Sequence, residues 1–177
     1  MTTLEILQKL DLAIETLFSN DRYLLERELN ERSIAFKLGE YLQPLFNGYN
    51  VDCEYNGDAG KENDIKALKI AKDEIEAIGK KANENDIYRI SPDVIIHKRG
   101  FNTSNLLVIE VKKDNSQEQF KNFDLIKLKH LTIPYLGNHY NYQLGVAIIF
   151  NTGANTGNKQ MIFFQNGNRI DNRNNLQ

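Results

Sequence analysis

The first part of the chain carries apolar residues at steps of three and four, the spacing that lines one side of an α-helix. We therefore predict an N-terminal helix within residues 1–20. Its apolar stripe runs over residues 3–18 and consists of Leu4, Leu7, Leu10, Ile14 and Leu17.

A second helix is predicted from Asp21, which is a suitable N-cap, to about residue 46, where an Asn-Gly pair ends it. Asn30 is an alternative start for a separate helix. The buried stripe of this helix comprises Ala35, Leu38, Leu42 and Leu45. One turn before the stripe stands Glu31, so a carboxylate heads the side of the helix that faces the core.

Several later segments have the short, β-branched patterns of strands. Apolar and polar residues alternate over residues 49–56, which predicts a half-buried strand. Residues 89–97 and 105–113 form two apolar runs separated by turn residues, which predicts an antiparallel hairpin. The second run is apolar on both faces until Glu110, as in a central strand that is covered on both sides.

The remaining elements complete an α/β domain. A helix is predicted over residues 117–131, and strands over 143–150 and 160–165. The charged residues 57–86 are predicted to form an excursion around one amphipathic helix, whose apolar positions are Ile65, Leu68, Ala71, Ile75 and Ile78. The polar tail over residues 172–177 is predicted to be disordered. We expect one domain over residues 1–177, with a mixed central sheet and helices on both faces.

Composition narrows the class of protein. The 177 residues are 41% hydrophobic and 26% charged, which is ordinary for a folded domain. The formal net charge of −2 means that any contact with nucleic acid must be local. The single cysteine, Cys53, cannot form an internal disulfide, so a reducing cytoplasm fits best. The N-terminus lacks the pattern of a signal peptide or a membrane span, and we expect no membrane partner.

The predicted hairpin brings three charged residues together. If it closes through residues 99–104, with residue 98 paired to 105, Asp93 lies directly opposite Glu110. Lys112 shares a strand face with Glu110, roughly 6.6 Å further along. Two close carboxylates need a cation, and hard oxygen donors with an open side suit Mg²⁺. Such a site, with the Lys112 ammonium beside it, is suited to phosphodiester hydrolysis.

These residues resemble a known family. Pro92-Asp93 followed by Glu110-Val111-Lys112, with Glu31 on a preceding helix, is similar to the PD-(D/E)xK nuclease superfamily and its restriction-endonuclease-like fold. The resemblance covers roughly residues 22–150. It implies that Asp93 and Glu110 are metal ligands and part of the catalytic set, with the Val111 carbonyl and Glu31 as further ligands. It also implies that Lys112 is catalytic and that the cofactor is Mg²⁺, with Mn²⁺ as an alternative.

Other patterns in the sequence fit a functional site less well. Asp64-Ile65-Lys66 repeats the spacing, but no strand precedes it. His97, His130 and His139 lack ligand spacing, and the glycine-containing stretch 151–159 lacks the phosphate-loop pattern. Lysines beside the site are candidates for contacts with phosphate groups, and a solvated helix face is the alternative explanation for them. Asp124 either has a structural role or positions the nearby Lys127. The candidate nucleic-acid-binding residues are Lys98, Arg99, Lys113 and Lys127, with Lys121 and Lys129.

We therefore predict a metal-dependent endo- or exonuclease. The resemblance favours DNA over RNA, and a chain this small needs a homodimer, a partner protein or recognition of a structure or end for specificity. The alternative is a catalytically silent nuclease-like module that binds a protein partner or nucleic acid. In that alternative Asp93, Glu110 and Lys112 form a salt-bridge cluster.

Overall fold

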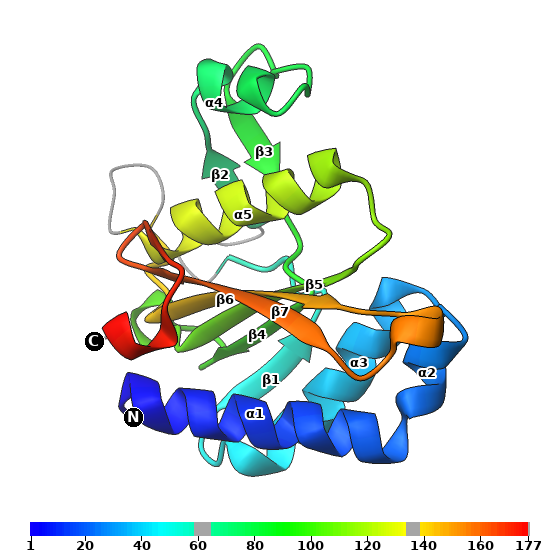
Figure 1. Ribbon diagram of the computed structural model, residues 1–177. Helices are drawn as coiled ribbons and strands as arrows, with labels where there is room; N and C mark the ends of the chain where they lie inside the picture. Colours follow the sequence, from blue (N-terminus) through cyan, green and yellow to red (C-terminus); the bar gives the residue numbers. More distant parts are fainter. Residues whose placement is uncertain (59–64, 134–138, 177) are drawn as a thin grey trace.

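A mixed six-stranded sheet forms the centre of the computed structural model, which describes residues 1–58, 65–133 and 139–176 (Figure 1). The strand order is β1-β4-β5-β6-β7-β8. β5 and β6 are parallel, and every other neighbouring pair is antiparallel. The strands are β1 (Asn50–Cys53), β4 (Val94–His97), β5 (Leu107–Lys113), β6 (Leu144–Phe150), β7 (Lys159–Gln165) and β8 (Asn168–Ile170).

Helices cover both faces of this sheet, as predicted for an α/β domain. One face packs against α1 (Thr3–Asn20) and α3 (Glu31–Leu42), and the other against α5 (Glu118–Thr132), which connects the parallel strands β5 and β6 (Figure 1). Each face has its own hydrophobic core, because alternate residues of the central strands point to opposite sides. Ile109 of β5, for example, packs toward α1 and α3, whereas Val108 packs toward α5.

The N-terminal helix is confirmed, and the second predicted helix is divided. A short α2 (Arg22–Glu26) ends before Glu28, whose φ of 53° lies in the left-handed region. The chain then restarts at Asn30, the alternative start, whose side chain accepts a 2.8 Å hydrogen bond from the Ser33 amide. This cap makes Glu31 the first residue of α3, where a negative charge is favoured by the helix dipole.

One glycine lets α3 lie close to the edge of the sheet. A Cβ atom at Gly39 would stand 2.6 Å from the Cys53 Sγ of β1, so a larger residue would push the helix outward. The helix continues into a 3₁₀ turn at Gln43–Leu45. Glu31, at the opposite end of α3, contacts the end of β5 through the Lys113 amide.

The excursion differs from the prediction of one amphipathic helix. It contains β2 (Ala67–Lys69), a six-residue α4 (Lys72–Ala77) and β3 (Ile87–Arg89), which pairs with β2; we call residues 67–89 the arm. Leu68 and Ile70 are fully buried while Lys69 between them is exposed, so strand alternation prevails over helical spacing here. Residues 59–64 of the predicted excursion lie outside the described residues.

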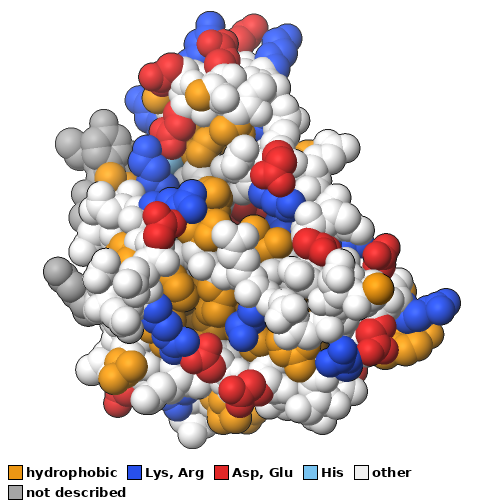
Figure 2. All heavy atoms as spheres, viewed as in Figure 1, with side chains coloured by type: hydrophobic (Ala, Val, Ile, Leu, Met, Phe, Trp, Pro, Cys, Tyr) orange, Lys and Arg blue, Asp and Glu red, His pale blue; other side chains and the backbone are white. Residues whose placement is uncertain are grey.

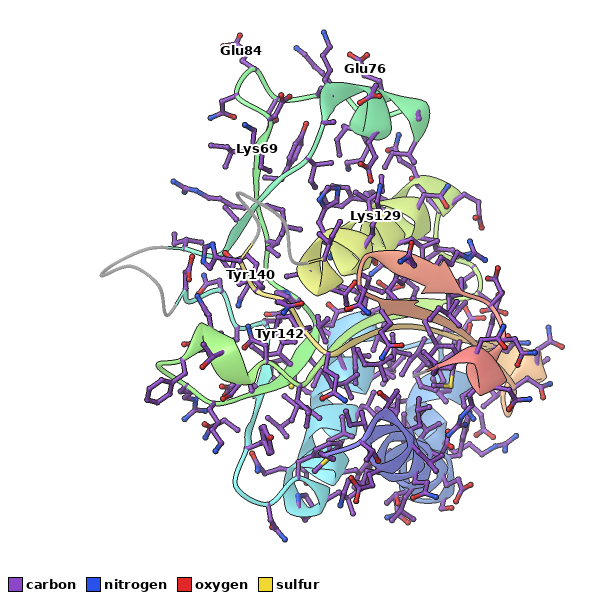
Figure 3. All side chains as sticks on the ribbon, turned by 90° about the vertical axis from the view of Figure 1, so that its left-hand side faces the viewer. Lys69, Glu76, Glu84, Lys129, Tyr140 and Tyr142 are labelled. Atoms are coloured by element: carbon purple, nitrogen blue, oxygen red, sulfur yellow. The ribbon has the colours of Figure 1, made fainter. Side chains whose placement is uncertain are left out.

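The arm rises beyond α5 and is tied to it (Figures 1 and 3). Glu74 of α4 forms ion pairs with Lys129 and His130 of α5, both at 3.1 Å. Gln119, near the start of α5, donates a 2.6 Å hydrogen bond to the Gly79 carbonyl. In Figure 3, Lys69, Glu76 and Glu84 lie on the arm above Lys129, while Tyr140 and Tyr142 lie below it.

The C-terminal end of the chain also differs from the prediction. The sequence pattern did not predict β8, and it predicted disorder over residues 172–177. Instead, Arg173–Asn175 form a 3₁₀ turn capped by Asn172, and Arg173 makes a 2.6 Å ion pair with Asp11 of α1. Leu176 packs against the hydrophobic core, which gives this polar tail an apolar anchor. Residue 177 lies outside the described residues.

The surface agrees with the small net charge. On the face shown in Figure 2, acidic and basic side chains are interspersed and do not separate by sign. In the described part of the chain, no helix combines the length and the apolar character needed to cross a membrane.

Candidate active site

The hairpin formed by β4 and β5 has the predicted register. Val94 pairs with Ile109 and Ile95 with Val108, so Asp93, just before β4, lies opposite Glu110. An Asp93 carboxylate oxygen accepts a 2.7 Å hydrogen bond from the Val111 amide, which fixes it against β5. Burial raises the pKa of Asp93, although the Lys112 ammonium and the Val111 amide oppose this shift.

Glu110 is buried among charged groups on the face that α5 covers. Its side chain is 1% exposed, and its Oε1 lies 2.8 Å from the Lys127 ammonium. Neither carboxylate oxygen has a hydrogen bond of good geometry within the described residues. Burial raises the pKa of Glu110 well above its usual value, opposed by Lys127 and assisted by Asp124 and Asp93.

Lys112 connects β5 to both neighbouring helices. Its ammonium lies 2.8 Å from Asp124 of α5 and 3.3 Å from Glu31 of α3, and it donates a 3.1 Å hydrogen bond to the Val111 carbonyl. Burial by itself would lower the pKa of Lys112, but the carboxylates of Asp124, Asp93 and Glu31 outweigh it and raise the pKa. The side chain is therefore held as a cation among anions.

Glu31 approaches from α3, as the helical pattern predicts. Besides the contact with Lys112, it accepts a 3.0 Å hydrogen bond from the Lys113 amide and a short one from the Ser116 hydroxyl. Both donors lie just after β5, on the segment that leads into α5. Glu31 thus joins the start of α3 to the end of β5.

Two residues of α5, Asp124 and Lys127, contact Lys112 and Glu110, which the sequence did not predict. Asp124 and Lys127, one turn apart, form a 2.6 Å ion pair, and Lys127 also pairs with Glu110. Burial by itself would lower the pKa of Lys127, but Glu110 and Asp124 raise it. The prediction of Lys127 as a surface residue for phosphate is wrong about its position, because the residue is only 8% exposed. Lys127 stands four residues before the buried Leu131, and this helical spacing indicates the buried face of α5.

The other residues predicted to bind nucleic acid lie in different parts of the structure. Lys113 lies at the site and donates a 3.1 Å hydrogen bond to the Glu28 carbonyl. Lys98 and Arg99 lie at the far end of β4, where the hairpin loop begins as predicted, roughly 16 Å from Asp93 at about 3.3 Å per residue. There Arg99 pairs with Asp52, and the Lys98 ammonium lies over the Tyr49 ring. Lys121 donates to the Asp114 carbonyl.

These observations define a charged cluster at the end of β5, which consists of Glu31, Asp93, Glu110, Lys112, Asp124 and Lys127. Four carboxylates and two ammonium groups have a formal sum of −2 when all are ionised. Among the described residues, no group of three or more His, Cys, Asp or Glu side chains is arranged to hold a metal ion. The two lysine ammonium groups stand between the carboxylates and separate them.

Two cavities adjoin the charged cluster. The larger, of about 470 Å³, is lined on one side by Glu31, Lys112 and Lys113, and on the other by Phe120 and Phe123. The smaller, of about 20 Å³, is lined by Glu110, Lys112 and Asp124 together with apolar residues, and has room for one water molecule. The cluster is thus buried on most sides and accessible on one.

A second buried lysine lies toward the root of the arm. Lys66 is 1% exposed, and its ammonium lies 4.4 Å from the Tyr140 ring centre, 5.7 Å from that of Tyr142 and 5.9 Å from that of Tyr55. We call these four residues the tyrosine cluster. Burial lowers the pKa of Lys66 to about 8, although Asp58 opposes the shift. Asp64, the acid of the competing Asp-x-Lys match, lies outside the described residues.

The three histidines lie apart from the charged cluster. Each contacts a different carboxylate: His97 lies 2.9 Å from Asp52, His130 lies 3.1 Å from Glu74, and His139 lies 3.0 Å from Asp58. Comparison of the chain with protein-family models, with curated proteins and with solved structures found no match.

Proposed function

We propose that this chain is a metal-dependent nuclease with a restriction-endonuclease-like core, whose active site is the charged cluster. The observation that carries the proposal is that the Glu110 carboxylate is buried without a well-formed hydrogen bond. It lies inside a cluster whose formal charge is −2 when all six groups are ionised. Buried negative charge that is only partly compensated favours a cation, and one divalent ion equals the deficit. The −2 sum and the adjoining cavity are features that a purely structural cluster does not need.

The donor groups fit Mg²⁺, with Mn²⁺ as an alternative. Asp93, just before β4, and Glu110 of β5 provide hard carboxylate oxygens, and the Val111 carbonyl follows directly after Glu110 in the sequence. Glu31 is a further ligand, directly or through water. When bound, the ion supplies activation of water and stabilisation of charge on a phosphate oxygen.

The lysines have separate roles in this proposal. Lys112 lies at the boundary between the cluster and the larger cavity, where its ammonium stabilises negative charge that develops on the phosphate. Lys127 is buried behind it and holds Glu110 and Asp124 in place, which makes it a positioning residue. Lys113 lines the cavity and is suited to bind a phosphate next to the one that is cleaved.

The substrate is proposed from the resemblance, which favours DNA over RNA and a cytoplasmic enzyme. The net charge of −2 and the interspersed charges in Figure 2 favour binding through the site itself, without a broad basic face. A homodimer or a partner protein remains part of the proposal as the source of sequence specificity.

A cleavage assay tests this proposal. Linear, circular and single-stranded DNA, and RNA, are incubated with the protein in Mg²⁺, in Mn²⁺ and in EDTA. We expect cleavage that needs the metal, and a rate about 10²–10³-fold lower in Lys112→Met, which keeps the length of the side chain and removes the charge. Lys129→Met is the matched control, because Lys129 lies on α5 and pairs with Glu74 outside the cluster.

A catalytically silent module is the second candidate, and the two lysines favour it. The ion pairs of Lys127 with Glu110 and Asp124, at 2.8 and 2.6 Å, already compensate part of the negative charge. In this candidate the protein cleaves none of the nucleic acids in either metal, and Lys112→Met only lowers the melting temperature. That combination of results would reject the nuclease proposal.

A further inference from the structure

The larger cavity beside the charged cluster has two chemically different walls. Lys112 and Lys113 provide positive charge on the β5 side, and the carboxylates of Glu31 and Asp124 also line the cavity. The rings of Phe120 and Phe123 form the α5 side. The volume of about 470 Å³ lies within the range of sites that enclose a small molecule. A ligand that fits both walls has an anionic group and a flat apolar group a short distance apart.

The aromatic wall is held in place by the arm. The Phe123 ring meets the Tyr88 ring of β3 edge-on at 6.3 Å, and the Lys80 ammonium lies 4.8 Å from its centre. The same ammonium lies 5.4 Å from the centre of the Phe120 ring. Phe120 is 47% exposed, although exposure of a phenylalanine to water is unfavourable. An exposed ring in a fixed position beside a charged site is suited to stack against a flat ligand.

A nucleotide has the two groups that these walls require. Its phosphate matches the lysine ammonium groups, and its base presents a flat face to Phe120. In a duplex the bases are stacked on one another and paired, so their faces cannot reach a protein ring unless the base is unpaired or turned out. A stacking wall next to the reactive cluster therefore selects unpaired nucleotides.

We propose that this cavity is a subsite for one unpaired nucleotide, and that the substrate is single-stranded nucleic acid or a single-stranded end. Phe120 stacks on the base, and Lys113 contacts the phosphate. The inference rests on the proposed nuclease function, because the cluster supplies the reactive side of the cavity. It adds a preference for unpaired nucleotides, which neither the charged cluster nor the hairpin requires.

Binding measurements test the subsite without any need for cleavage. Fluorescence anisotropy is recorded for a labelled single-stranded DNA oligonucleotide, the same sequence as a duplex, and its RNA counterpart, in EDTA and in Ca²⁺. We expect the parent protein to bind the single strands more tightly than the duplex. Phe120→Ala should weaken single-strand binding roughly five- to 150-fold, as expected for the loss of one base–aromatic stack, and should leave duplex binding nearly unchanged.

Two controls separate stacking from general damage. Phe120→Trp retains a ring and should keep the single-strand preference. Phe101→Ala removes another exposed phenylalanine, 62% exposed and beyond the far end of β4, and should change nothing. Equal affinity of the parent for single strand and duplex, or an equal loss for both in Phe120→Ala, would overturn the subsite.

The two proposals fail in different ways. If the protein cleaves duplex and single strands equally well and Phe120→Ala has no effect, the nuclease stands and the subsite is rejected. If the single-strand preference depends on Phe120 but no substrate is cleaved in Mg²⁺ or Mn²⁺, the subsite stands and the nuclease is rejected. The DNA and RNA oligonucleotides show which sugar the subsite accepts.

Discussion

Lys127 and Lys66 are both buried lysines, but their surroundings have opposite effects on them. Lys127, in the charged cluster, contacts Glu110 and Asp124, and these carboxylates raise its pKa in spite of burial. Lys66, in the tyrosine cluster, lies over three aromatic rings, and burial lowers its pKa to about 8. Burial thus favours the neutral form of a lysine only where neighbouring charges do not compensate it.

The two regions differ in how closely carboxylates approach the buried lysine. In the charged cluster, buried acids and lysines stabilise one another, and loss of any member leaves the others without compensation. In the tyrosine cluster, the ring faces offer only a weaker cation–π attraction. A fold gains little stability from gathering six charged side chains, because each buried charge loses its hydration.

The largest expected effect comes from breaking the charged cluster at Lys127. Lys127→Met removes the partner of Glu110 and Asp124 and leaves both carboxylates buried, so the free energy of unfolding should fall by about 3–5 kcal/mol. Urea denaturation measures this change. Lys129→Met, on the same helix, should cost less than about 1 kcal/mol, because the Lys129 side chain is 43% exposed and water screens its ion pair with Glu74.

A double variant shows whether the loss comes from charge. Adding Glu110→Gln to Lys127→Met removes one of the two uncompensated carboxylates and should restore part of the stability. If Lys127→Met costs no more than Lys129→Met, the ion pairs do not stabilise the fold and the comparison with Lys66 fails.

The next effect is stabilisation by a metal ion. At a concentration of Mn²⁺ about 100 times its dissociation constant, the free energy of unfolding should rise by about 2.7 kcal/mol. Asp93→Asn should remove this gain, and Lys66→Met should preserve it, since Lys66 lies outside the charged cluster. Thermal denaturation with and without Mn²⁺ is the measurement, and equal gains in the parent and Asp93→Asn would place the metal elsewhere.

The rise in the free energy of unfolding on binding Mn²⁺ should also depend on pH. The pKa values of Asp93 and Glu110 are raised, so both carboxyl groups hold protons at higher pH than ordinary acids do. Protons compete with the metal for these oxygens. The gain from Mn²⁺ should therefore be smaller at pH 5.5 than at pH 8, whereas equal gains at both values would argue against ligation by these two groups.

The smallest effect concerns Lys66. Its pKa is lower in the folded protein than in the unfolded chain, so below about pH 8 both states bind the proton and the cost of the buried charge is fully present. As the pH rises above 8, the folded state loses the proton first, and stability should increase by at most about 1.4 kcal/mol per pH unit. Lys66→Met should lack this rise, which denaturation at pH 8 and pH 9 detects; the same slope in both proteins would mean that another group titrates.

Several parts of the site follow from local patterns along the chain. Strand alternation and the turn residues fix the hairpin register, and this register places Asp93 opposite Glu110 and puts Lys112 on the same face. The capping preference of Asn30 and the helical stripe after it place Glu31 at the start of α3. In each case the position of the residue follows from its neighbours along the chain or from the repeat of one strand or helix.

The packing of the whole chain sets which distant groups contact the hairpin. The rotation of α5 about its axis is set by its packing on β5 and β6, through residues such as Leu128 and Leu131, and this rotation turns Asp124 and Lys127 toward Glu110. The same is true of Lys66, whose rings come from residues more than 70 positions away, apart from Tyr55. A sequence pattern shows which face of a helix is apolar, but a buried lysine and an exposed one look alike until the packing of the whole chain assigns their neighbours.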